Sequence, residues 1–212
     1  MTRLVLASTS PARLALLRAG GIEPITISPG VDEDLVTARA TEMGLITGTA
    51  DMVQLLAKAK AEAVVNHPDA QGALIIGCDS SLEFDGKSLG KPHEPEVAIK
   101  RWQAMRGRAG TLYSGHWLID NRNPSGAGLS PATGRVSSSI VHFADISDEE
   151  IEAYVATGEP LKVAGAFTID GLGGAFLRSI EGDAHTVIGL SLPTLRDLVI
   201  NLGVSYPSLW NK

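Results

Sequence analysis

Residues 3–21 read RLVLASTSPARLALLRAGG. Residues 3–7, apolar except for Arg3, predict a buried strand, and the polar residues that follow predict a loop. A helix is predicted over residues 11–19, because Ser10 suits its N-cap, proline suits its first position and a glycine pair follows its last residue. The chain therefore opens with a strand, a loop and a helix.

Further along, the apolar run of residues 73–78 predicts a central strand that is covered on both faces and delivers Asp79 to its end. Asp85-Gly86 predicts a hairpin turn between two short strands. Predicted strands also cover residues 25–28, 111–119, 136–143 and 175–180, and predicted helices cover residues 50–66, 95–105, 147–158 and 193–202. This alternation predicts a mixed α/β fold. Residues 120–135, rich in Gly, Pro and Ser, are expected to form a long loop, either a lid or a tolerated surface insertion.

Length and composition predict a protein with a substantial core. Its 212 residues, 44% hydrophobic and 20% charged, can form a single domain over residues 1–212, built as one unit or as two closely joined lobes. The net charge of -6 argues against a nucleic-acid binder, which needs a broad basic face. The single Cys78 offers neither a disulfide nor a metal-binding pair, and it is interpreted as a small buried hydrophobe.

The sequence also bears on where the protein acts. No apolar run is long enough to cross a membrane, and the start of the chain turns into loop residues too early for a signal peptide. We therefore expect a cytoplasmic protein that binds no membrane and no nucleic acid.

The loop before the first helix is a candidate anion site. Free backbone NH groups and the positive end of the helix dipole point at one place there. Ser8 and Ser10 can donate hydroxyl hydrogen bonds, and Arg13 can present its planar guanidinium to phosphate oxygens. An ordinary capped helix with a surface arginine is the alternative.

Two groups of carboxylates could hold a metal ion or activate water. Asp32, Glu33 and Asp34 form an acidic loop whose oxygens suit a hard divalent cation, although solvated acidic turns are commoner. Asp79 follows an apolar strand, where open α/β sheets place groups that contact ligands. Its carboxylate could bind a metal or take a proton from water, and the alternative is a turn residue that caps the next serines.

Lysines are the remaining candidates for an anionic ligand. Lys91 lies in the rigid turn Gly90-Lys91-Pro92, and Lys58 or Lys60 lies on the predicted helix 50–66. The 5 histidines show no zinc-ligand spacing, and the sequence contains no GxGxxG loop, Walker A loop or GxSxG elbow. An anion site, a carboxylate-held metal and scattered cations without a covalent nucleophile together indicate phosphoanhydride hydrolysis.

Residues 6–13, followed by Leu16-Leu17, resemble the opening of the Maf family of nucleoside triphosphate pyrophosphatases, also described as septum-formation inhibitors. Other family motifs follow in the same order, so the resemblance spans nearly the whole chain. They are Asp32-Glu33, residues 57–61 around Lys60, Asp79, Gly90-Lys91-Pro92, residues 147–160 (SDEEIEAYVATGEP) and residues 182–190.

The resemblance implies an enzyme that cleaves a nucleoside triphosphate between its α and β phosphates, giving a nucleoside monophosphate and diphosphate with Mg²⁺ or Mn²⁺. The family removes certain standard or modified nucleotides and is linked to arrest of cell division. Its fold is an elongated mixed sheet flanked by helices, with a cleft between two lobes, as in the inosine triphosphate pyrophosphatases. Homodimers are frequent among its members. A nucleotide-binding regulator of septum formation without turnover is the alternative function.

The resemblance also implies roles for particular residues. It assigns phosphate binding to Ser8, Ser10 and Arg13, with added positive charge from Lys60 and Lys91 as the diphosphate leaves. Glu33 would hold the metal. Asp79 would be the base that orients the attacking water, and a metal-ligand role for it is chemically as reasonable.

Some positions depart from the family pattern. Where the family often reads Asp-Lys-Ala-Gly, this chain has Lys162-Val163-Ala164-Gly165, and a frequent Gln is replaced by Asp170. A common His is replaced by Gly110. Asp170 near the triphosphate would add a metal ligand or alter base selection, so the preference of a family branch for one base does not carry over.

Overall fold

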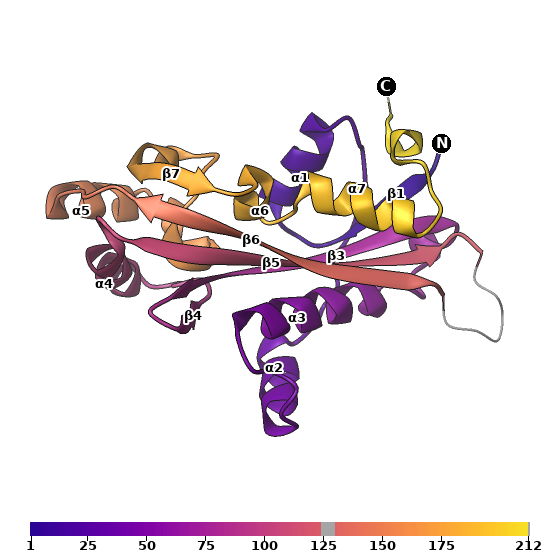
Figure 1. Cartoon of the computed structure of the whole chain (residues 1–212), viewed down its shortest axis with the longest axis horizontal. Helices are drawn as coiled ribbons and strands as arrows, with labels where there is room; N and C mark the ends of the chain where they lie inside the picture. The colour runs from indigo at the N-terminus through magenta and orange to yellow at the C-terminus, as the bar shows by residue number, and fades with distance from the viewer. Residues whose placement is uncertain (124–129, 212) are drawn as a thin grey trace.

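The fold is a mixed α/β sheet flanked by helices, as the sequence predicts (Figure 1). A computed structural model describes residues 1–123 and 130–211. The strands are β1 (Arg3–Ala7), β2 (Ile25–Ile27), β3 (Ala73–Phe84), β4 (Lys87–Leu89), β5 (Ala109–Asn121), β6 (Ala132–Phe143) and β7 (Leu177–Glu181). The helices are α1 (Pro11–Ala19), α2 (Glu33–Glu42), α3 (Thr49–Ala63), α4 (Pro95–Met105), α5 (Asp148–Ala156), α6 (Ala184–Ile188) and α7 (Leu192–Asn201). Five short 3-10 turns complete the described part: η1 (Pro68–Ala70), η2 (Glu159–Lys162), η3 (Ala164–Ala166), η4 (Leu172–Phe176) and η5 (Tyr206–Leu209).

The sheet has the strand order β2-β1-β3-β5-β6-β7, and β4 pairs with β3 outside this path. β1 runs parallel to β2 and β3, whereas β5, β6 and β7 are antiparallel to their neighbours. The long strands β3, β5 and β6 run along the longest axis of the molecule (Figure 1). The sheet is therefore elongated and mixed, as expected.

One edge of β3 is interrupted. β5 pairs with β3 along residues 73–83, whereas on the other edge β1 ends opposite Gly77 and β4 begins opposite Leu82. Within the described residues, no strand pairs with this edge of residues 78–81. We call this edge segment the notch. Its backbone groups are not used by a neighbouring strand, so they can take other partners, as the Cys78 carbonyl does in accepting a hydrogen bond from Arg13.

Helices cover both faces of the sheet. α3 packs so closely on β3 that a Cβ at Gly77 would lie 2.2 Å from the carbonyl oxygen of Ala57, which explains the glycine at this position. α1, α6 and α7 cover the opposite face (Figure 1). Cys78 faces that side in a core cluster with Leu17 and Leu195, and burial raises the pKa of its thiol to about 12. Cys78 is thus a buried hydrophobe, as predicted.

A second core cluster lies toward the other end of the sheet. It centres on Trp102 of α4, whose ring makes edge-to-face contacts with Phe143, Tyr154 and Phe176. Such aromatic pairs add to the stabilisation that burial gives. The division of residues 1–212 into two closely joined lobes stays a prediction.

Several predicted elements have the expected bounds. The strand at 3–7, the helices at 11–19 and 95–105 and the hairpin at Asp85-Gly86 are all present. Both turn residues have positive φ angles, 49° and 70°, as a two-residue hairpin requires. Ser147 and Glu150 form the capping box that begins α5.

Other predictions were wrong in detail. The acidic loop of residues 31–34 is the start of α2, because Asp32 is its N-cap and accepts a hydrogen bond from the Leu35 NH. Asp79 is not at the end of its strand but inside β3, which continues to Phe84 through pairing with β5. The helix predicted over 50–66 ends at Ala63.

The sequence did not predict α6 or the 3-10 turns. The long loop predicted over residues 120–135 is shortened by β5 and β6, and residues 124–129 lie outside the described residues. Across residues 1–123 and 130–211, no helix combines the length and the apolar character needed to cross a membrane.

Candidate functional site

Three charged side chains meet beside the notch. The Lys60 Nζ lies 2.6 Å from Oδ1 of Asp79 and 2.8 Å from Oε1 of Glu33. Lys60 and Asp79 are buried, with 7% and 8% of their surface exposed, whereas the Glu33 side chain is 48% exposed. We call Glu33, Lys60 and Asp79 the charged cluster. It forms from α2, α3 and β3, which are separated in sequence.

The local folding of each element explains this meeting. Successive side chains of a strand point to opposite faces, so Asp79 faces α3 as Gly77 does. Lys60 lies on the face of α3 that packs on β3. The cap at Asp32 places Glu33 in the first turn of α2, beside α3. All three were candidates from the sequence, and the structure brings them together.

Burial is the main influence on the Asp79 carboxylate. It raises the pKa of Asp79 above its usual value, and nearby Glu33 adds to this effect, whereas Lys60 and Arg13 oppose it. A carboxylate with a raised pKa is a better proton acceptor than an exposed one. Asp79 is therefore suited to general-base chemistry.

Arg13 lies on the other face of β3. Its guanidinium donates to the backbone oxygens of Gly189 (2.8 Å) and Cys78 (2.9 Å) and to the hydroxyls of Ser80 (3.1 Å) and Ser8 (3.3 Å). These bonds use four of the five N–H groups of an arginine. Arg13 is only 9% exposed. It therefore ties α1, the notch and the end of α6 together, and direct phosphate binding by Arg13 stays a prediction.

The loop of residues 8–10 is fixed by its own serines. The Ser8 hydroxyl accepts a hydrogen bond from the Ser10 NH (3.1 Å), and the Ser10 hydroxyl accepts one from the Arg13 NH (3.4 Å). Because Arg13 also contacts Cys78 and Ser80 on either side of Asp79, this loop is held close to the notch. The start of α1 therefore lies near the notch, and anion binding there stays a prediction.

Lys91 and Asp170 are not joined to this cluster. Both side chains are exposed, and no hydrogen bond or ion pair within the described residues connects either one to Asp79. Lys91 follows Gly90, whose carbonyl accepts a bond from the Gly165 NH, so it lies near η3. The roles of Lys91 and Asp170 stay predictions.

Sequence reasoning missed Ser80 as a contact residue. Its hydroxyl accepts from Arg13 and lies 2.8 Å from the Ser114 hydroxyl, which donates to the Thr186 carbonyl. This chain of hydroxyls links the notch to β5 and α6. Had the strand predicted at residues 73–78 been extended to residue 84, the alternation of side chains would have placed Ser80 on the face of β3 that Arg13 contacts.

Glu159 was also missed as a structural centre, although it lies in the quoted 147–160 motif. Its carboxylate accepts hydrogen bonds from the Tyr154 and Thr168 hydroxyls and from the backbone NH groups of Leu172 and Gly173. Glu159 thereby ties the segment that carries Asp170 to α5. Burial opposes its ionisation, but the bonds from Thr168, the two NH groups and Tyr154 outweigh this and lower its pKa to about 2.

We expect Glu159→Gln to destabilise the protein in a pH-dependent way. The folded pKa lies below the ordinary value of 4.5, so the stabilisation is present above about pH 4.5 and is lost as the pH falls toward about 2. Denaturant unfolding at about pH 7 and about pH 3 should show a smaller gap between wild type and variant in acid. Glu152→Gln, on the exposed face of α5, is the control. A gap that does not shrink in acid would refute this account of Glu159.

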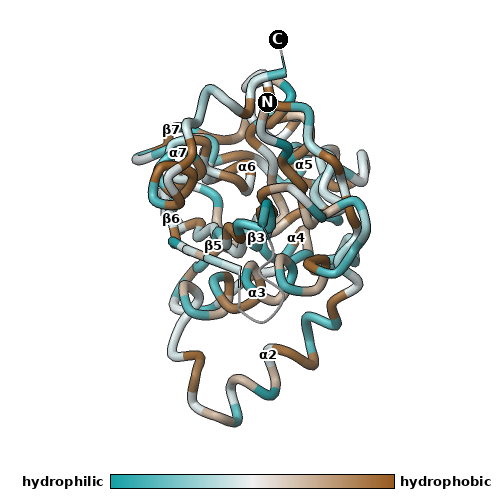
Figure 2. The backbone as a smooth tube through the Cα atoms, turned by 90° about the vertical axis from the view of Figure 1, so that its right-hand side faces the viewer, coloured by the Kyte–Doolittle hydropathy of each residue, from teal (hydrophilic) through white to brown (hydrophobic). Residues whose placement is uncertain are grey.

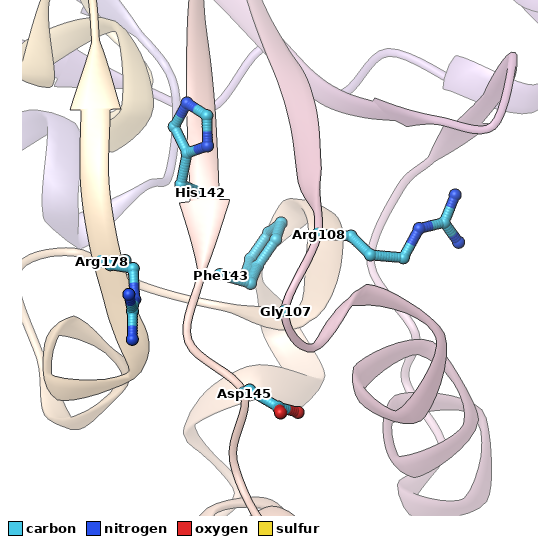
Figure 3. A pocket seen from close by; sticks show the side chains of 6 residues that line it. All are labelled: Gly107, Arg108, His142, Phe143, Asp145 and Arg178. Carbon is cyan, nitrogen blue, oxygen red and sulfur yellow. The ribbon is translucent and has the colours of Figure 1, made fainter.

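A described cavity lies elsewhere on the molecule. It has a volume of about 320 Å³ and is lined by Gly107, Arg108, His142, Phe143, Asp145 and Arg178 (Figure 3). The Arg108 side chain points away from it and pairs with Asp85 (Figure 3). We call it the distal cavity, and it contains none of the candidate residues. The chemistry of the charged cluster and its position at the notch make it the candidate site in preference to the distal cavity.

Comparison with known proteins agrees with the sequence motifs. The family model for Maf-like protein matches residues 3–202. A protein from Leifsonia xyli subsp. xyli is 55% identical over 213 residues, covering 99% of this chain and 97% of the relative. One from Streptomyces avermitilis is 50% identical over 208 residues, covering 98% and 94%. Both relatives are named nucleoside triphosphate pyrophosphatase.

A solved structure, that of the Staphylococcus aureus Ham1 protein, matches with a TM-score of 0.42 and 14% identity over 95% of each chain. A score this low establishes nothing by itself.

Proposed function

Because this chain belongs to the Maf-like protein family, we propose that it is a nucleoside triphosphate pyrophosphatase. It hydrolyses a nucleoside or deoxynucleoside triphosphate to the monophosphate and diphosphate. The observation that supports this proposal is the charged cluster, together with the bonds by which Arg13 of α1 joins the residues on either side of Asp79. No covalent nucleophile is needed for this reaction.

Two carboxylates of the cluster fit a divalent metal. Asp79 and Glu33 each present an oxygen to one point, and hard oxygen donors suit Mg²⁺ or Mn²⁺. Among the described residues no group of three or more acidic, His or Cys side chains could hold a metal. Mg²⁺ commonly uses one or two carboxylates together with substrate phosphates, so the pair is sufficient. When bound, the metal would neutralise charge on the phosphates.

The residues of the cluster divide the remaining work. Asp79 accepts a proton from the attacking water in addition to serving with Glu33 as a metal ligand. Lys60 is placed to stabilise negative charge on the departing diphosphate. Lys91 adds a further positive charge in this proposal.

The phosphates lie against the loop in this proposal. Ser8 and Ser10 donate hydroxyl hydrogen bonds, while Arg13 holds the loop and offers its remaining N–H. Asp170 lies near the triphosphate and influences which base is accepted. We further propose that the substrates are cytoplasmic nucleotides, including non-standard ones, and that the protein works as a homodimer.

The test is a panel of standard and modified triphosphates with Mg²⁺, Mn²⁺ or no metal, with products identified by phosphorus NMR. The expected products are monophosphate and diphosphate, formed only with metal. Release of orthophosphate would reject this reaction. Tight nucleotide binding without any product would instead favour the alternative, a regulator of septum formation that lacks turnover and acts through a protein partner.

A further inference from the structure

Lys60 occupies the point at which the two candidate metal ligands converge. Its ammonium lies 2.6 Å from Asp79 and 2.8 Å from Glu33, so both carboxylates direct an oxygen at the same atom. The Lys60 side chain is 9% exposed, which restricts where the ammonium can move. One lysine therefore satisfies both carboxylates from inside the protein.

The neighbouring lysine on α3 shows that this arrangement is particular to Lys60. The Lys58 side chain is 45% exposed, and its Nζ lies 3.8 Å from Glu62 and 5.3 Å from the centre of the Trp117 ring. Exposed pairs of this kind contribute little to stability. Lys58 thus offers a matched lysine on the same helix that does not touch the charged cluster.

A divalent cation and this ammonium cannot share the same position. Mg²⁺ binds carboxylate oxygens at roughly 2.0–2.1 Å, inside the space that the Lys60 Nζ fills at its contacts with Asp79 and Glu33. A nearby ammonium would also repel the cation, and the repulsion is strong where burial excludes water. Binding of the metal by both carboxylates therefore requires Lys60 to withdraw.

We propose that Lys60 is an internal competitor of the divalent metal, holding Asp79 and Glu33 in place and setting a low affinity for the cation. This inference rests on the proposed function, because it assumes that the two carboxylates are metal ligands. It gives Lys60 a role in addition to stabilising phosphate charge. The metal would bind well only when the ammonium has another anion to contact, such as a substrate phosphate.

The test is direct binding of Mn²⁺ to the full chain without nucleotide, measured by electron paramagnetic resonance of the free ion. Lys60→Met keeps an unbranched side chain only one atom shorter but removes its charge, and it is expected to bind Mn²⁺ at least about tenfold more tightly than wild type. Lys60→Arg keeps a positive charge and is expected to bind weakly. Lys58→Met is the control and should match wild type.

Affinity that is unchanged or lower in Lys60→Met would overturn the proposal, as would an equal gain in Lys58→Met. Thermal unfolding establishes whether each variant folds, and Lys60→Gln serves in place of Lys60→Met if methionine prevents folding. The readout is separate from turnover. A protein that binds Mn²⁺ as predicted but releases no diphosphate would reject the proposed function alone, whereas normal diphosphate release without the affinity change would reject the competitor role alone.

Discussion

Asp79→Asn is expected to lower the rate of diphosphate release by about 10²- to 10⁴-fold, the usual contribution of a positioned acid or base. Asparagine has nearly the same shape but can neither accept a proton from water nor bind a metal as an anion. The measurement is steady-state release of diphosphate from the best triphosphate of the panel.

The variant should still fold. Lys60 would lose one partner but keep Glu33. Burial of the charged carboxylate is unfavourable and therefore raises the pKa of Asp79, and an uncharged amide does not have this cost. Circular dichroism and thermal unfolding check this. Asp69→Asn, an exposed carboxylate beside β3, is the matched control and should retain activity. Turnover of Asp79→Asn near that of wild type would reject the catalytic role.

Arg13→Ala is expected to lower the free energy of unfolding by about 3 kcal/mol, because it removes a buried guanidinium with four hydrogen bonds. The carbonyls of Cys78 and Gly189 would lose a charged donor. Gly189 has a φ of 114°, and a Cβ there would lie 3.1 Å from the Arg13 Nε, so the contact is closely fitted. Urea unfolding followed by fluorescence measures the loss.

Arg18→Ala provides the control on the same helix. Arg18 is exposed and, within residues 1–123 and 130–211, forms its ion pair with Glu23 at the surface, so its removal should have little effect on stability. Nucleotide binding should also weaken in Arg13→Ala, because the loop of residues 8–10 loses its anchor. If Arg13→Ala were as stable as Arg18→Ala, the structural role of Arg13 would be wrong.

The start of the fold could be predicted because its local signals agree. Ser10, Pro11 and Gly20 mark the ends of α1, and a short apolar run marks β1. β3 was harder, because polar residues after Cys78 interrupt its apolar pattern. The pairing with β5 over residues 73–83 keeps those residues in the strand, and such long-range pairing leaves no local mark.

The members of the candidate site were predictable one by one, but their contacts were not. Glu33, Lys60 and Asp79 each stood out by residue type and motif, whereas their meeting depends on the packing of α3 on β3 and of α2 on α3. From the sequence, residues 31–34 were interpreted as an acidic loop, and no helix was predicted over residues 33–42. The position of α2 away from the sheet is clear in Figure 2. Arg13 contacts the face of β3 opposite to Asp79 because neighbouring residues of a strand point to opposite faces. To predict this from the sequence, one would have to know that β3 continues past residue 78.

The most direct test of the account is a crystal structure with Mn²⁺ and a triphosphate analogue whose α–β bridge cannot be hydrolysed. We predict that the anomalous signal of Mn²⁺ lies between Glu33 and Asp79, with the phosphates against residues 8–10 and the Lys60 ammonium moved onto a phosphate oxygen. A nucleotide bound in the distal cavity, with Lys60 still bridging Glu33 and Asp79, would contradict the account.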